Sequence, residues 1–98
     1  MEEFNYTDML TKLQELILGM PPGEEKNKLK QQRQELSDII KKLVEKNVRK
    51  DTAKYNQITA QLENANASIQ DAIKDIKKIG ETINTIASVI TSVREALK

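Results

Sequence analysis

The sequence predicts an all-α protein, either an elongated helical hairpin or a three-helix bundle, with one long, coiled-coil-like C-terminal helix. Residues that are apolar or tolerate burial recur at alternating steps of three and four from Tyr55 to Leu97, which is the spacing of one stripe along a helix. The 98 residues include only three glycines and two prolines, so few turns are expected. Aromatic residues make up 3% and charged residues 32%, a composition that favours an elongated helical domain over 1–98.

The first helix is expected at about 6–18. Asn5 precedes it and is suited to accept a hydrogen bond from the first turn as an N-cap. Gly19 is expected to adopt a left-handed conformation after the last turn, and the Pro-Pro-Gly break within 19–23 cannot continue the helix. Seven of the twelve positions 9–20 are apolar, so this segment must bury against another element.

The second helix is expected at about 24–46, followed by a turn at 47–51. Glu24 and Glu25 lie in its first turn, where the helix dipole favours anions. Its first half is strongly polar, whereas its second half carries a cluster of aliphatic residues. The second half is therefore the part expected to pack against another helix.

The third helix is expected at about 52–97, with Asp51 or Thr52 as its N-cap. At 1.5 Å per residue it would be roughly 70 Å long. Only alanine fills the apolar stripe at 64–68, which makes this the weakest stretch. A break there is the alternative, but the heptad phase continues across it, and we expect one continuous helix.

Two arrangements of these helices are consistent with the pattern. In the hairpin, the first two helices lie end to end along the third. In the bundle, the first helix folds across the second, and the end of the third projects and pairs with another chain. The first helix could pack on its own chain or on a neighbour, and we favour its own chain.

The C-terminal half of the heptad is the predicted interaction seam. Isoleucine at both the a and the d positions disfavours a simple parallel dimer and favours three or more strands. Several flanking positions are small or apolar, which widens the face that must be buried. The expected partners are other copies of this chain, another helical protein, or both. The seam consists of Ile69, Ile73, Ile76, Ile79, Ile83, Ile86, Ile90, Val93 and Leu97.

Residues 82–93 contain no charged side chain. This segment is expected to be buried in an assembly or to form a small-polar solvated face. Membrane binding is the weakest interpretation, because interfacial helices usually carry basic and large aromatic residues. No apolar run is long enough to span a bilayer, and the acidic start is unlike a signal peptide. Cytoplasmic location is the default expectation, with signal-independent export as the alternative.

No enzymatic chemistry is expected from this composition. The chain contains no histidine and no cysteine, which removes the commonest general base, the commonest metal ligand and any thiolate site. Asp71 and Asp75 stand one turn apart, but the lysines around them indicate ordinary surface pairing. The basic residues of the second helix form no single coherent face, which argues against nucleic-acid binding. No cofactor or metal is expected.

These observations predict a non-enzymatic interaction or assembly protein that acts through the seam. The alternative is a monomeric helical inhibitor or chaperone-like module whose exposed apolar stripe docks a partner helix. A weaker third hypothesis is a membrane-active component that opens its hairpin.

Overall fold

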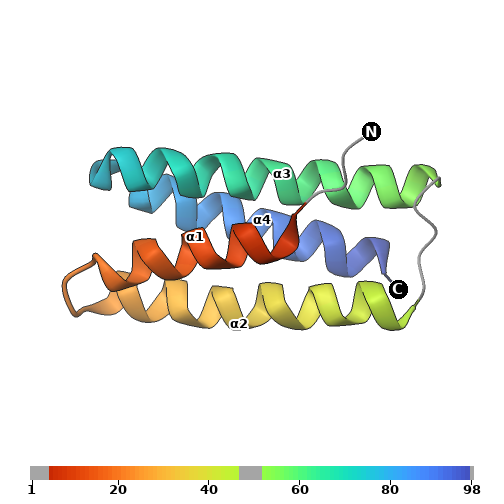
Figure 1. Cartoon of the computed structure of the whole chain (residues 1–98), viewed down its shortest axis with the longest axis horizontal. Coiled ribbons are helices and arrows are strands. Elements are labelled where there is room, and N and C mark those ends of the chain that lie inside the picture. The colour runs from red at the N-terminus through yellow and green to blue at the C-terminus, as the bar shows by residue number, and fades with distance from the viewer. Residues whose placement is uncertain (1–4, 47–51, 98) are drawn as a thin grey trace.

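The computed structural model describes residues 5–46 and 52–97, and this part of the chain is an all-α helical bundle without strands (Figure 1). Four α-helices measure 40 × 25 × 19 Å together. In chain order the elements are α1 (Tyr6–Leu18), α2 (Glu24–Glu45), α3 (Ala53–Lys74), a single 3-10 turn η1 (Ile76–Lys78) and α4 (Ile79–Ala96). The turn expected at 47–51 lies outside the described residues.

The bundle consists of two helical hairpins, α1–α2 and α3–α4. In Figure 1, α3 and α2 form the upper and lower edges, with α1 in front of α4 between them. Each helix therefore packs on two others, and α1 and α4 lie diagonally opposite. The neighbouring helices α2 and α4 run in the same direction. The Gln32 side chain donates to the carbonyl of Ile83, and the Lys46 side chain donates to the carbonyl of Leu97. Both pairs are 51 residues apart in sequence, as parallel packing requires.

The single long helix expected over 52–97 is wrong, because the chain reverses at Asp75. Helix α3 is continuous through 64–68, but Asp75 leaves the helical conformation with φ −142° and ψ 101°. Its carboxylate then accepts a hydrogen bond from the backbone N–H of Lys77 at 3.1 Å and starts the η1 turn. Folding α4 back onto α3 buries the apolar stripe of 79–97 within the chain, which a straight helix would leave uncovered.

Neither expected arrangement of the helices is the observed one. The first helix does not continue the line of the second, so the end-to-end hairpin is wrong. Instead α1 folds back on α2 and also packs on α3. That part of the bundle alternative is correct, but no C-terminal tail projects, because α4 occupies the fourth position of the bundle.

Two helices begin with N-cap residues that the sequence predicts. The Asn5 side chain accepts a hydrogen bond from the N–H of Asp8 at 2.9 Å, and the Thr52 hydroxyl accepts one from Tyr55 at 3.2 Å. The left-handed conformation expected at Gly19 is wrong: its φ is −82° and its ψ −6°. Its N–H instead bonds the carbonyls of the last α1 turn, so glycine's special freedom is not used.

One continuous hydrophobic core joins all four helices. Met9 and Leu13 from α1 are fully buried, together with Leu29 and Leu36 from α2. The first helix is therefore buried on its own chain, as the density of apolar residues in it requires. Apart from Val89, the α3 and α4 contributions come from the heptad stripe, whose buried members include Ile58, Leu62, Ala65, Ile69, Ile79, Ile86, Ile90 and Val93.

Candidate interaction surfaces

The predicted interaction seam is divided between the interior and the surface. Six of its nine members are buried in the core, namely Ile69, Ile79, Ile86, Ile90, Val93 and Leu97. Ile83 is partly buried and packs against the same core. Only Ile73 and Ile76 are exposed, by 44% and 54%. In this fold the seam mainly joins α4 to its own chain. Of the two exposed isoleucines, Ile73 lies in the last turn of α3 and Ile76 begins η1.

The α3–α4 hairpin also has a buried polar contact. The Thr82 side chain is fully buried, and its hydroxyl lies 3.0 Å from the carbonyl oxygen of Ser68 in α3 and 3.1 Å from that of Lys78, so both oxygens are acceptors for its one proton. The Ser68 hydroxyl lies 3.1 Å from the same Thr82 oxygen. Because an unpaired buried hydroxyl is costly, this contact favours one register of α4 on α3.

A groove follows the line where α2 and α4 meet. It consists of three adjoining hollows of ≈ 270, ≈ 290 and ≈ 450 Å³, all of which include Arg94 in their walls. The groove begins near Lys28 and Ala87 and ends near Lys46 and Leu97. Over α2 this distance is about 27 Å, at 1.5 Å per residue. We call it the α2–α4 groove.

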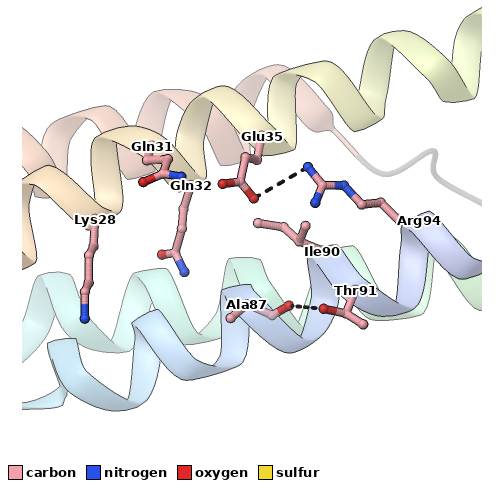
Figure 2. A pocket seen from close by; sticks show the side chains of 8 residues that line it. All are labelled: Lys28, Gln31, Gln32, Glu35, Ala87, Ile90, Thr91 and Arg94. Carbon is pink, nitrogen blue, oxygen red and sulfur yellow. Dashed lines mark hydrogen bonds and ion pairs between the residues drawn. The ribbon is translucent and has the colours of Figure 1, made fainter.

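The two walls of the α2–α4 groove differ in charge. Its charged residues are Lys28, Lys41, Lys42, Lys46 and Arg94 against Glu35, Asp38 and Glu45, so five basic and three acidic groups leave a net +2. All but Arg94 come from α2 or, for Lys46, from its C-cap. Figure 2 shows the Arg94 guanidinium reaching across to Glu35, with a separation of 3.6 Å. Both side chains keep substantial exposure, so this ion pair contributes little to stability.

Apart from Arg94, the exposed residues on the α4 wall of the groove are small and uncharged. Ala87 and Thr91 line it and are exposed, and the Thr91 hydroxyl bonds the carbonyl of Ala87 in its own helix at 3.1 Å. Asn84 and Ser88 are also exposed, so the charge-free segment 82–93 presents a small-polar face beside the groove. Small side chains keep this part of the groove open in Figure 2.

Gln32 forms part of the groove wall between these two helices. Its side chain points from α2 toward α4 in Figure 2, and its Nε2 donates to the carbonyl of Ile83 at 2.9 Å. Its Oε1 is buried, and none of the described residues donates a hydrogen bond to it. Ala87 and Arg94 flank the predicted seam and Gln32 lies outside it, and only the parallel packing of α2 on α4 brings the three together.

The other candidate sites of the sequence are not assembled in this fold. Asp75 ends α3 and uses its carboxylate as a local cap, whereas Asp71 stays within α3. Within residues 5–46 and 52–97, no group of three metal-ligating side chains is close enough to hold an ion. None of the described helices is long and apolar enough to cross a membrane.

Comparisons of the chain with protein-family models, with curated proteins and with solved structures found no match.

Proposed function

We propose that this chain is a non-enzymatic protein-interaction module that receives a partner helix in the α2–α4 groove. The observation that carries the proposal is the groove itself, which extends along most of α2 and along the second half of α4 instead of forming a closed pocket. The lining residues span about 27 Å over α2 and about 15 Å over α4, which correspond to about five and about three helical turns. Laying one helix into a groove between two others is a common mode of peptide recognition.

The charge of the groove indicates the chemistry of that partner. With five basic and three acidic groups, the groove attracts a helix that presents carboxylates on its flanks. Ala87 and Thr91 leave room for close approach on the α4 side, and neither carries a charge that would have to be desolvated. At the far end, the aliphatic stems of Lys42 and Lys46 offer an apolar contact to the same helix. The expected partner is therefore an amphipathic helix with an acidic rim.

This proposal is tested with two variants that add the same charge to neighbouring positions of α4. Ala87→Glu places a carboxylate and extra volume in the groove, whereas Ser88→Glu places them on an exposed position outside its walls. Partners captured from the native source by the wild-type chain are identified and then retested singly as purified proteins. We expect Ala87→Glu to lose binding and Ser88→Glu to retain it. Equal binding by both folded variants would contradict a role for the groove.

A second function is supported by a separate observation. Ile73 and Ile76 belong to the predicted seam and are exposed together at one end of the bundle. Exposed aliphatic side chains near a turn favour association, so we propose that the chain also assembles with copies of itself. Light scattering across micromolar concentrations tests this, and a constant monomer mass would contradict it.

A further inference from the structure

We propose that two copies of this chain exchange α4 by straightening the turn at 75–78. In the exchanged dimer, α3 and α4 of one copy form one continuous helix, and its α4 part packs on α3 of the other copy. The inference rests on the self-assembly proposed above, and it adds how the two copies join. It follows from three observations: the heptad phase across the turn, the construction of the turn, and the isoleucines exposed beside it.

The heptad does not change phase where the chain reverses. Ala72, Ile76 and Ile79 continue the alternating steps of four and three from α3 into α4. A loop inserted between two independent helices has no reason to preserve this phase. In a straight helix the preserved phase would keep the whole stripe from Tyr55 to Leu97 on one face. The same sequence is therefore compatible with both a folded-back and a straight conformation.

The turn contains no residue that prevents helix formation. Asp75 is the only residue between α3 and η1, and it is neither proline nor glycine. What distinguishes the turn is the Asp75 carboxylate, which accepts a hydrogen bond from the Lys77 N–H at 3.1 Å. A short hinge between two helices that could instead be continuous is the usual basis of domain exchange.

Exchange of α4 would bury the two exposed isoleucines, Ile73 and Ile76. In the folded-back chain Ser68 lies opposite Thr82, so the antiparallel pairing of α3 and α4 is centred midway, at residue 75. Two straightened helices paired in the same register would therefore cross at their 75 positions, about a two-fold axis. This brings Ile73 and Ile76 of one copy beside those of the other. These two seam members would then be covered by a second copy of the chain.

The remaining contacts would be retained in the exchanged form. The buried Ser68–Thr82 contact and the core contacts of Ile86 and Val93 would form between copies instead of within one copy. Exchange therefore costs mainly the freedom of one molecule relative to the other. It is favoured by the new contact at the hinge and by high protein concentration.

A disulfide can report directly which chain supplies α4. The sequence contains no cysteine, so Ser68→Cys and Thr82→Cys introduce one pair, at side chains whose oxygens lie 3.1 Å apart. Oxidation of a folded-back chain gives a disulfide within one chain. Oxidation of the exchanged dimer links two chains, which denaturing electrophoresis without reductant resolves. We expect linked dimers in the full-length chain, in a proportion that rises with protein concentration during refolding.

Two hinge variants of the cysteine-bearing chain should move the equilibrium in opposite directions. Asp75→Ala removes the cap that closes the turn, so straightening each hinge no longer loses that contact. Because a dimer straightens two hinges, we expect the association constant of this variant to rise about thirtyfold. Ile76→Pro fits the first position of η1 after an extended Asp75, but it cannot lie inside a straight helix. It should abolish linked dimers while the disulfide within one chain still forms, which also shows that the hairpin folds.

Ile76→Ala separates the hinge from the exposed side chain. It removes the isoleucine but permits a straight helix, so linked dimers should persist in reduced amount. The exchange would be overturned if the cysteine-bearing chain, with and without Asp75→Ala, had a dimer mass but formed disulfides only within each chain. That result would leave the self-assembly standing. A monomer mass for Asp75→Ala at all concentrations would overturn both.

Discussion

Gln32 in α2 ties its side chain to the backbone of Ile83 in α4 through a 2.9 Å hydrogen bond. This contact joins helices that are not neighbours in sequence, near the start of the parallel α2–α4 interface. Gln32 is only 9% exposed, and its Oε1 has no donor among the described residues. The contact therefore defines the position of α2 on α4 but leaves a buried acceptor unpaired.

Replacing Gln32 by methionine should leave the free energy of unfolding unchanged or raise it by up to about 1 kcal/mol. Methionine keeps the shape of the side chain and removes the unpaired oxygen, whose burial costs about 1–3 kcal/mol. Gln32→Glu should lower stability by about 2 kcal/mol or more, because it buries a carboxylate beside the Ile83 carbonyl oxygen. Urea denaturation followed by circular dichroism measures both. A loss above about 2 kcal/mol for Gln32→Met would contradict this account.

Thr82→Val should lower stability by about 1–2 kcal/mol, since it removes a buried hydroxyl and leaves the Ser68 hydroxyl without its partner. Thr91→Val is the matched control in the same helix, because Thr91 is exposed and its hydroxyl bonds the carbonyl of Ala87 within α4. It should change stability by less than about 0.5 kcal/mol. Thermal or urea unfolding compares the two variants, and equal losses would argue against the buried contact.

Ile86→Asp and Ile76→Asp should have different effects, although both change the heptad stripe. Ile86 is fully buried, so an aspartate there costs several kcal/mol and should abolish cooperative unfolding. Ile76 is 54% exposed, so Ile76→Asp should remain folded and should lose self-association instead. Circular dichroism and light scattering together separate these outcomes. An Ile76→Asp chain that is folded and fully associated would contradict the role given to the hinge isoleucines.

Deletion of residues 1–20 should remove cooperative unfolding and cause aggregation. Met9, Leu13, Leu16 and Ile17 are buried against α2 and α3, so the deletion exposes the apolar residues that face them. Replacing only Leu18, which is 69% exposed, by serine is the control and should change little. Analytical ultracentrifugation and melting curves measure both. A truncated chain that stays soluble with an unchanged melting temperature would show that α1 contributes nothing to the core.

The sequence by itself determined the helical class and the local starts of helices. Capping depends on a side chain and the N–H groups two or three residues later, so Asn5 and Thr52 could be predicted as caps. Periodicity likewise identified which face of 55–97 is buried, because Ile58, Ile69 and Ile86 all lie in the core. These features depend only on residues close together in the chain.

Only the tertiary structure decided what covers that face. A heptad states that a stripe is apolar, but it does not state whether another chain or the same chain covers it. Asp75 is compatible with either a straight helix or a capped turn, and the burial of 79–97 against α3 favours the turn. The α2–α4 groove is likewise absent from any local pattern. Lys28 and Ala87 line opposite walls of the groove because two helices distant in sequence pack in parallel. That packing depends on the core of the whole bundle.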